Sequence, residues 1–469
     1  MDSQEKPQAF LASPRQHVLM ITNHGIHQWK VIPGLPDTGG QNVFVNQFTE
    51  ELARLGFKIT VVNRGGYSHP RTGEWHRGLR YKDGHQRILY LEDGLDEFVR
   101  KEDMAKRIPH LVKALKKSLD AEGVKTDLIL SHYWDGAKVG ILYNRTLPER
   151  VKHIWIPHSL GTVKKRNVSP DRWAGLRLDE RIAIERDMVE GRGLDGIAAT
   201  SSTIRQALEE DYGYTGAILF LPPCVDTERF HPRDVPDTDK VWGFLSQRSG
   251  LSPQEVRRCK IVTEISRTDT TKRKNVLIEA FASTQQWVPN SVLIISIDDG
   301  RKELARELKG LIRTLPSQVQ DHIATVGSVW DVLPTLYAVT DVYCTPSVME
   351  GFGMSAQEAA ATGVPIVASH LVPFVTEYLL GEGGLEGAGD TRPAKRGRGA
   401  VVVRAGDVDG FAYALKMLLT NDELRQEMGK NAYHITIPYF TWRNVVPAFL
   451  DKTGTSPGNA EGICDEPAN

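Results

Sequence analysis

The stretch DLILSHYWDGAKVGILYNRTLPERVKHIWIPHS, residues 127–159, shows the pattern that decides the fold of this chain. Two short apolar runs, DLILSHY at 127–133 and HIWIPHS at 153–159, are separated by a stretch with the period of an amphipathic helix. Runs of this kind are typical of strands that are buried on both faces. A buried strand, a helix and a second buried strand in succession predict neighbouring strands of a parallel sheet.

The same alternation recurs along most of the chain. In the first half, further apolar runs stand at HVLMIT (17–22), KITVVN (58–63) and GIAATSS (196–202). The pattern begins again later, with KIVTEIS at 260–266, SVLIISI at 291–297, HIATVGS at 322–328, DVYCTPS at 341–347, VPIVAS at 364–369 and GAVVVRAG at 399–406. We therefore expect an α/β protein with two doubly wound parallel sheets, whose strand ends face a ligand-binding cleft.

A polar stretch without periodicity, RDVPDTDK at 233–240, separates the two series of strands and predicts a linker. The length of 469 residues agrees with two domains, because it exceeds what one hydrophobic core usually supports. The expected domains are residues 1–235 and 236–440, with a helix at about 440–455 that packs back on the first domain. The glycine-rich segment 381–400 predicts a surface loop and residues 456–469 a flexible tail.

The charge balance excludes some classes of function. Lys and Arg total 58 against 59 Asp and Glu, so no overall positive field would hold nucleic acid or an anionic membrane. No apolar run approaches the roughly 18 residues of a membrane span, and the first sixteen residues lack the pattern of a secretory signal. We expect a cytoplasmic protein that is not integral to a membrane.

The chain has four cysteines: Cys224, Cys259, Cys344 and Cys464. Because they are far apart in the sequence, they predict neither a zinc cluster nor disulfides.

Two motifs of the first half follow strand ends. Gly39 and Gly40 precede a helix, where backbone amides at its N-terminus could hold a phosphate; a tight turn is the alternative. The glycine pattern matches neither a dinucleotide fingerprint nor a P-loop. His158 opens HSLG at the end of a predicted strand, where a neutral imidazole could hydrogen-bond a sugar hydroxyl. The cations at 164–166 could bind a phosphorylated partner or simply be solvated.

Basic residues also stand between a strand and a helix in the second half. Arg267 follows KIVTEIS, and Lys272, Arg273 and Lys274 precede the helix NVLIEAFAST. An Arg and a Lys at one helix N-terminus suit a diphosphate, although cations on a loop can also be merely solvated.

The strongest motif is TPSVMEGFGMSAQEAAATGVPIVAS at 345–369. Its two carboxylates, Glu350 and Glu358, are too far apart to share one atom and fit an extended ligand, one at a sugar ring and one at a ribose diol. The structural alternative is that Glu350 caps a helix to which Glu358 merely belongs. The backbone amides between them suit phosphate oxygens: Phe352, Gly353, Met354 and Ser355.

These residues together resemble the retaining nucleotide-sugar glycosyltransferases of family 4, from about residue 17 to about residue 450. The most specific element is the pair Glu350 and Glu358, with seven residues between them, followed by the run that ends in PIVAS. PPCVDTERF at 222–230 agrees as well, with Cys224 where the family usually has glycine. The resemblance implies the GT-B fold of two Rossmann-like, doubly wound parallel-sheet domains that face a cleft.

Within the family, DTGGQ at 37–41, HSLG with Lys164, and the RIxxE string at 181–185 look most like sucrose-phosphate synthases. Those enzymes join glucose from UDP-glucose to fructose 6-phosphate. NVFVNQFTEEL and SHYWDGA also resemble the branch that glycosylates inositol phosphate.

The resemblance implies a ligand for each motif. The implied assignments are Gly40 and Gln41 at donor or acceptor phosphates, His158 at the transferred sugar, Lys164 and Arg181 at the acceptor phosphate, Arg267 and Lys274 at the diphosphate, Glu350 at the donor sugar hydroxyls, and Glu358 at the ribose. RTDTTKRKN is two residues longer than the family pattern, so the choice between Lys272 and Lys274 as the diphosphate lysine stays open.

The expected reaction needs no cofactor. Asp298 and Asp299 follow a strand but predict a cap or a solvated turn, so Mg²⁺ could be present without being essential. Alternative acceptors are another small polyol, inositol phosphate, a glycerate-type compound or a lipid, with GDP-mannose or another UDP-sugar as donor. A peripheral membrane enzyme would use the amphipathic stretch 108–123. The non-enzymatic alternative is a protein that binds a nucleotide sugar without turnover.

Overall fold

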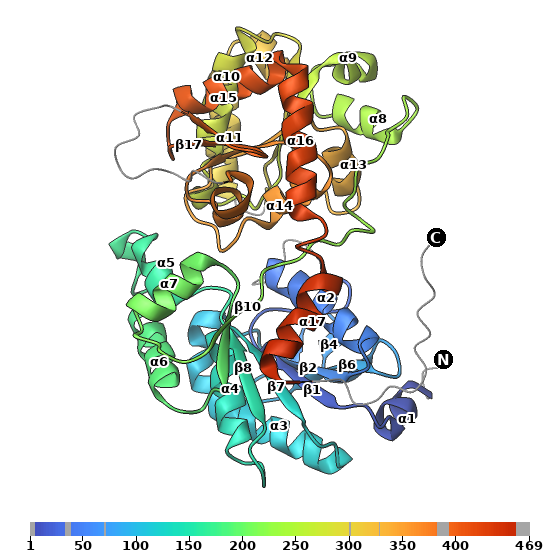
Figure 1. Ribbon diagram of the computed structural model, residues 1–469, viewed down its shortest axis with the longest axis vertical. Coiled ribbons are helices and arrows are strands. Elements are labelled where there is room, and N and C mark those ends of the chain that lie inside the picture. The colour runs from blue at the N-terminus through green and yellow to red at the C-terminus, as the bar shows by residue number, and fades with distance from the viewer. Residues whose placement is uncertain are drawn as a thin grey trace. The chain divides into compact units, whose positions relative to one another are not determined.

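The computed structural model describes residues 5–32, 39–69, 72–299, 302–327, 329–381 and 394–455. It divides the chain into two compact units, which are shown in Figure 1. The first consists of Met1–Pro222 with Trp442–Asn469, and the second of Pro223–Thr441.

The division falls after Pro222 and not near residue 235, where the sequence places it. Residues 223–235 belong to the second unit because their backbone is tied to it. Gln357 Nε2 donates to the carbonyl of Pro223 at 2.9 Å, and Val225 N donates to Phe440 O at 2.8 Å. The polar segment at 233–240 is therefore part of the second unit, although its composition predicts a linker.

The first unit is built on one mixed sheet with the strand order β10-β9-β8-β7-β1-β2-β6-β5. Its strands are β1 His17–Ile21, β2 Lys58–Arg64, β5 Gly78–Tyr81, β6 Gln86–Leu91, β7 Leu128–His132, β8 Lys152–Ile156, β9 Gly196–Ala199 and β10 Ile218–Phe220. Neighbouring strands run parallel except β5, which is antiparallel to β6. A short ribbon, β3 Tyr67–Ser68 with β4 Trp75–His76, lies outside this sheet.

Most helices of this unit stand between two strands in the sequence, as the alternating pattern predicts. The helices of the unit are α1 Glu5–Ala12, α2 Gly40–Arg54, η1 Lys101–Arg107, α3 Ile108–Glu122, α4 Tyr133–Asn144, α5 Gly161–Arg166, η2 Pro170–Arg172, α6 Leu178–Glu190, α7 Ser202–Glu210 and the C-terminal α17 Trp442–Thr453. Helix α17 packs against α2, which fits the expectation that the last helix returns to the first domain.

Helix α3 is the amphipathic stretch that a peripheral membrane protein would expose. Pro109 lies in its first turn, and Gly123 ends it in the left-handed conformation with φ 66°. Its apolar residues recur every fourth position, and Leu111, Leu115 and Leu119 are all buried, where the helix packs against α4. The apolar face of this helix is therefore part of the core. Among the described residues, no helix is long and apolar enough to cross a membrane.

The second unit has a sheet with the strand order β13-β12-β11-β14-β15-β17-β16. Its strands are β11 Lys260–Glu264, β12 Ser291–Ser296, β13 Ile323–Val326, β14 Val342–Thr345, β15 Ile366–Ser369, β16 Ala394–Arg396 and β17 Ala400–Val403. Its helices are α8 Lys240–Ser246, α9 Pro253–Arg258, η3 Thr270–Lys272, α10 Lys274–Gln285, α11 Lys302–Thr314, α12 Ser317–Asp321, α13 Leu333–Ala338, α14 Met354–Ala361, η4 Val375–Leu379, α15 Val408–Thr420 and α16 Asp422–Thr436.

Strand β12 shows why the strands of this sheet appear as continuous apolar runs in the sequence. Val292 and Ile294 belong to one buried cluster, whereas Leu293 and Ile295 belong to a second cluster on the opposite face. Both faces of the strand are therefore covered, as in the parallel sheets of α/β proteins.

The segment 381–400, expected to be a surface loop, contains an edge strand. Residues 394–396 pair antiparallel with β17, with Lys395 opposite Val402. An edge strand needs partners on one side only and tolerates charged residues, so it leaves no apolar run in the sequence. Residues 382–393 and the tail at 456–469 lie outside the described residues.

Candidate active site

His158 lies directly beyond the carboxyl end of β8, as the sequence predicts. Its backbone is left-handed, with φ 55°, a conformation that side chains other than glycine rarely adopt and that is common at functional sites. Its Nε2 lies 2.9 Å from Nδ1 of His132, the last residue of β7. Burial lowers the pKa of His158 to about 3, so its imidazole is neutral at physiological pH. A neutral ring can both donate and accept hydrogen bonds.

The loop after His158 is held by α6. Arg181 Nη2 donates to the carbonyl of Ser159 at 2.6 Å and to its hydroxyl at 3.1 Å. Glu185 accepts from the backbone N–H of Gly161 at 2.8 Å and from Arg181 Nε at 2.7 Å. A Cβ on Gly161 would lie only 2.7 Å from a side-chain carbon of Ile182, so this close approach requires glycine. The RIxxE string therefore clamps the HSLG loop.

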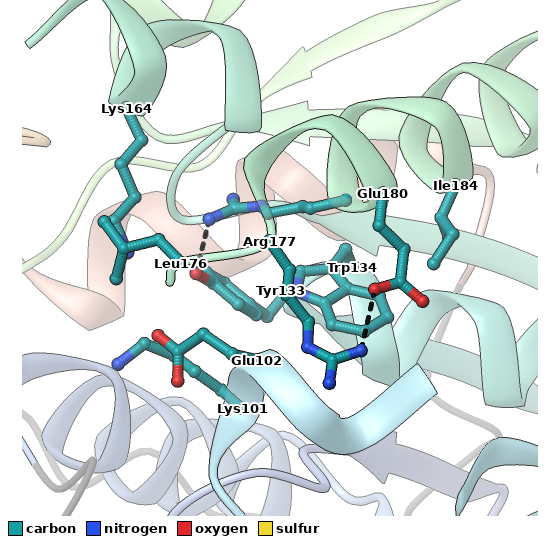
Figure 2. A pocket seen from close by; sticks show the side chains of 10 residues that line it. Lys101, Glu102, Tyr133, Trp134, Lys164, Leu176, Arg177, Glu180 and Ile184 are labelled. Carbon is teal, nitrogen blue, oxygen red and sulfur yellow. Dashed lines mark hydrogen bonds and ion pairs between the residues drawn. The ribbon is translucent and has the colours of Figure 1, made fainter. Parts of the chain in front are cut away.

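A pocket in the same unit brings together basic side chains from separate segments (Figure 2). We call it the basic pocket; its lining residues are Lys101, Glu102, Tyr133, Trp134, Lys164, Leu176, Arg177, Glu180, Arg181 and Ile184. Lys101 comes from η1, Lys164 from α5 and Arg181 from α6. The sequence-predicted acceptor residues Lys164 and Arg181 thus line one pocket.

The two arginines of the basic pocket are paired with acids, and Arg181 lies 2.7 Å from Glu185. Arg177 pairs with Glu180 at 3.3 Å and with Asp103 at 3.0 Å. Arg181 Nη1 donates to the hydroxyl of Tyr133 at 2.5 Å. Figure 2 shows the contact between Arg177 and Glu180 in the pocket. Burial raises the pKa of Tyr133, so its hydroxyl stays protonated. The pocket offers guanidinium, ammonium and hydroxyl groups, the set that binds phosphate.

Three lining residues with groups that could donate to a phosphate were not predicted from the sequence: Lys101, Tyr133 and Arg177. Tyr133 carried a signal in the sequence, because it is the last residue of the apolar run DLILSHY, at the predicted strand end. In the structure its φ is 63°. Lys101 stands in a polar stretch far from the motifs in sequence, and Arg177 precedes the RIxxE string by four residues without belonging to it.

The glycine pair Gly39 and Gly40 stands at the N-terminus of α2. Gln41 Nε2 donates to Thr22 Oγ1 at 2.8 Å, which places this side chain at the residue after β1. Gly40 is the first residue of the helix, where backbone N–H groups have no intrahelical acceptor. Asp37 and Thr38 of the DTGGQ motif lie outside the described residues.

In the second unit, the two lysines that the sequence could not separate have different surroundings. Lys274 is buried at the start of α10, and its ammonium donates to Glu264, to Ser266 O at 3.1 Å and to Ser296 Oγ at 2.9 Å. These three bonds use its whole donor capacity. Lys272 instead donates to the carboxylate of Glu350. Arg267 lies on the same loop and is exposed.

The loop that carries Glu350 leads into α14. Gly353 has φ 111°, and a Cβ there would lie 2.7 Å from a side-chain carbon of Val372, so glycine is required. The first helical bond runs from Gln357 N to Gly353 O at 3.0 Å. The N–H groups of Met354 and Ser355 therefore lack intrahelical acceptors and suit an anion. The ring of Phe352 is buried, 5.5 Å from that of Phe374, so only its backbone could meet a ligand.

Glu358 lies in the second turn of α14. Burial raises its pKa to about 7, and the positive charge of Arg229 offsets only part of this effect. A carboxylate with a raised pKa in a helix beside a glycine-rich loop is typical of a ligand-binding position, although structural pairs also shift pKa values.

Of the two acids considered as a cation site, one has a side-chain ion pair and the other a backbone hydrogen bond. Asp299 pairs with Lys309 at 2.7 Å, and Asp298 N donates to Thr268 Oγ1 at 2.7 Å. Among the described residues, no group of three or more His, Cys, Asp or Glu side chains is arranged to hold a metal ion.

Two family models match the chain, one in each half. The model of Glycosyltransferase Family 4 matches residues 38–229, and that of Glycosyl transferases group 1 matches residues 253–435. The chain belongs to family 4 of the GT-B glycosyltransferases.

The relatives of this glycosyltransferase act on different compounds. It is 26% identical to mannosylfructose-phosphate synthase of Agrobacterium fabrum, over 92% of this chain and 90% of the relative. It is 27% identical to D-inositol 3-phosphate glycosyltransferase of Corynebacterium jeikeium, over 85% of this chain and 88% of the relative.

Solved structures confirm the fold of this glycosyltransferase. Sucrose-phosphate synthase of Thermosynechococcus elongatus superposes with a TM-score of 0.72 at 22% identity, covering 94% of this chain and 98% of that one. HepE of Anabaena, solved with UDP and glucose, gives a TM-score of 0.65 at 15% identity, covering 94% and 99%. The GT-B architecture predicted from the sequence is thereby confirmed.

Proposed function

We propose that this glycosyltransferase moves a hexose from a nucleoside diphosphate sugar to a phosphorylated sugar, with retention of anomeric configuration. The favoured pair is UDP-glucose and fructose 6-phosphate. The observation that carries the proposal is the basic pocket, in which Lys101, Lys164 and Arg181 converge with the hydroxyl of Tyr133. A phosphate monoester carries close to two negative charges near pH 7, and guanidinium and ammonium groups recognise it.

The names of the relatives support a phosphorylated acceptor. Mannosylfructose-phosphate synthase and D-inositol 3-phosphate glycosyltransferase both name a phosphate ester, and both align with more than four fifths of this chain. The phosphate-binding groups of the basic pocket would serve either ester.

On the donor side, we assign the diphosphate to Arg267, Lys272 and the amides at the start of α14. Lys274 is replaced by Lys272 in this role because the three donors of Lys274 are taken by protein acceptors, whereas Lys272 lies beside Glu350. Glu350 would bind hydroxyls of the donor sugar and Glu358 the ribose. His158 is the residue of the first unit that we assign to the transferred sugar.

The proposed reaction follows the movement of charge. The bond from the anomeric carbon to the diphosphate oxygen breaks, and the acceptor oxygen bonds to the same face of that carbon. The acceptor proton passes to the departing phosphate oxygen. Negative charge grows on the diphosphate as its bond lengthens, so Arg267, Lys272 and the helix amides stabilise the transition state more than the ground state. No metal is required in this scheme, which predicts full activity in EDTA.

A screen of donors against acceptors tests the proposal. UDP-glucose and GDP-mannose are each offered fructose 6-phosphate, fructose, inositol phosphate and a glycerate-type acceptor, and released nucleoside diphosphate is measured. We expect release from UDP-glucose that depends on fructose 6-phosphate and not on fructose. Equal rates with fructose would contradict the phosphate assignment. Absence of release from every pair would support a binding protein without turnover.

A second candidate acceptor is inositol phosphate, and the observation that favours it is Tyr133. This residue belongs to SHYWDGA, which resembles the inositol-phosphate branch, and its hydroxyl contacts Arg181 in the basic pocket. Faster turnover with inositol phosphate than with fructose 6-phosphate in the same screen would favour this assignment. A lipid acceptor is disfavoured, because the apolar face of α3 is buried.

A further inference from the structure

Two histidines from neighbouring strands form a hydrogen-bonded pair. His132 ends β7 and is fully buried, and His158 follows β8, which pairs with β7 so that His132 stands opposite Ile156. His132 Nδ1 and His158 Nε2 are 2.9 Å apart, and the rings are inclined by only 20°. The rings of Phe44 and His158 form a T-shaped pair with centroids 4.9 Å apart. A bond between two ring nitrogens requires that one of them carries the proton and the other a lone pair.

The surroundings of His132 decide which nitrogen donates. Its other nitrogen, Nε2, is buried and has no hydrogen-bond partner among the described residues. The Nε2 atom of His27 is also buried without a hydrogen-bond partner, so the Nε2 atoms of His27 and His132 do not bond to each other. An N–H buried without an acceptor is rarer and more costly than an unpaired lone pair. His132 therefore carries its proton on Nδ1 and donates it to His158.

This arrangement determines the state of the His158 ring. Burial lowers the pKa of both histidines, so each is neutral and holds one proton. Because Nε2 of His158 accepts the bond, its proton lies on Nδ1. His158 is half-buried, and its Nδ1 forms no hydrogen bond with the described residues. The Nδ1–H group is thus the donor that the ring offers to a ligand.

We propose that His132 is a positioning residue that fixes the tautomer and ring orientation of His158, so that His158 presents Nδ1–H to a hydroxyl oxygen of the transferred sugar. The proposal rests on the proposed function in assigning His158 to that sugar. Arg181 and Glu185 of α6 bind the backbone of the HSLG loop, and His132 binds the side chain of His158 in the same loop. In the other tautomer Nδ1 would carry a lone pair, so the ring could accept a hydrogen bond from the sugar hydroxyl but could not donate one to its oxygen.

The tautomer can be measured without any substrate. Nitrogen-15 spectra of protein labelled in its histidine rings, with His158 assigned by the His158→Gln variant, show which nitrogen carries the proton. We expect Nδ1 of His158 to be protonated and Nε2 to have the shift of a hydrogen-bonded lone pair. A proton on Nε2 of His158 would overturn the proposal. This readout is independent of turnover, so it stands even if no donor proves to be a substrate.

Kinetics of two His132 variants test the positioning role. Asn keeps a side-chain N–H donor near the place of Nδ1, whereas Leu removes it. We expect His132→Leu to lower kcat by about 10- to 100-fold with the donor KM little changed, and His132→Asn to retain most of kcat. Equal losses in both variants, or an unchanged kcat in His132→Leu, would contradict the proposal.

The matched control is His153→Leu. His153 is also fully buried, and its Nε2 bonds to Ser131 Oγ at 2.7 Å. Within the described part of the chain, its side chain forms neither a hydrogen bond nor a ring pair with His158. It reports the effect of losing a buried histidine from the same sheet, and we expect its kcat to stay within about threefold of the parent. A loss as large as that in His132→Leu would show that general disruption of the sheet explains both, against the proposal. If His132→Leu does not fold, the nitrogen-15 spectra decide.

Discussion

The ammonium group of Lys274 donates to the carboxylate of Glu264, and the two side chains are 1% and 0% exposed. The same ammonium group holds the carbonyl of Ser266, at the start of the loop that carries Arg267 and Lys272. Lys274 therefore anchors the loop from within the protein, and Lys272 is left as the lysine beside Glu350.

The first prediction concerns the stability that this buried pair provides. Replacing Lys274 by Met leaves the charge of Glu264 buried without its partner, which should lower the free energy of unfolding by about 3–5 kcal/mol. Urea unfolding measures this loss. The double variant Glu264→Gln/Lys274→Met should recover part of it, because no unpaired charge remains. Unchanged stability of Lys274→Met with loss of nucleotide binding would show that Lys274 contacts the diphosphate itself.

We expect Lys272→Ala to lower activity and not stability, in contrast to Lys274→Met. Loss of one cation that stabilises the departing diphosphate should lower kcat/KM for the donor roughly 100-fold, with little change in unfolding. Steady-state kinetics with varied donor measure it. The control is Arg273→Asn, which removes the adjacent exposed cation and keeps a residue that tolerates its left-handed φ of 50°. A similar loss in the control would mean that only the overall charge of the loop matters.

Lys164→Ala tests the basic pocket. Because charged hydrogen bonds contribute more than neutral ones, the acceptor KM should rise about 10- to 100-fold while the donor KM stays unchanged. Lys165→Ala is the matched control, since Lys165 lies on the same helix, pairs with Asp179 at 2.5 Å and does not line the pocket. An unchanged acceptor KM in Lys164→Ala would remove this lysine from the phosphate site.

Glu358 makes the stability of the second unit depend on pH. Its pKa is raised from 4.5 to about 7, so between these values the folded protein keeps a proton that the unfolded chain has released. The free energy of unfolding contributed by this group therefore falls as pH rises through that range. Glu358→Gln should be more stable than the parent by about 1–3 kcal/mol at pH 8, with a gap that narrows toward pH 5. Urea unfolding at several pH values measures the gap, and a gap independent of pH would contradict the buried state of this carboxyl.

Much of the fold could be predicted because a parallel strand that is buried on both faces consists of consecutive apolar residues, which are visible in the sequence. The edge strand β16 left no such run, since it pairs on one side only and contains Lys395 and Arg396. The strand KIVTEIS did carry a missed signal: Glu264 interrupts an apolar run, and a buried acid requires a partner, which is Lys274.

The candidate site could be predicted where its residues follow strand ends, as His158 and Glu350 do. Lys164 and Arg181 could be placed together only through the family resemblance. Lys101 and Arg177 reach the basic pocket from polar stretches whose position depends on how η1 and α6 pack, and periodicity contains no information about such packing. The same limit explains why the different surroundings of Lys272 and Lys274 could be distinguished only in the structure.

The most direct test of the account is the preference for a phosphorylated acceptor, measured as the ratio of kcat/KM for fructose 6-phosphate to that for fructose. The parent protein should strongly prefer the phosphate ester, and the double variant Lys101→Ala/Lys164→Ala should lose most of this preference through slower reaction of the ester alone. A ratio that is the same in the parent and in the double variant would contradict the claim that the basic pocket binds the acceptor phosphate.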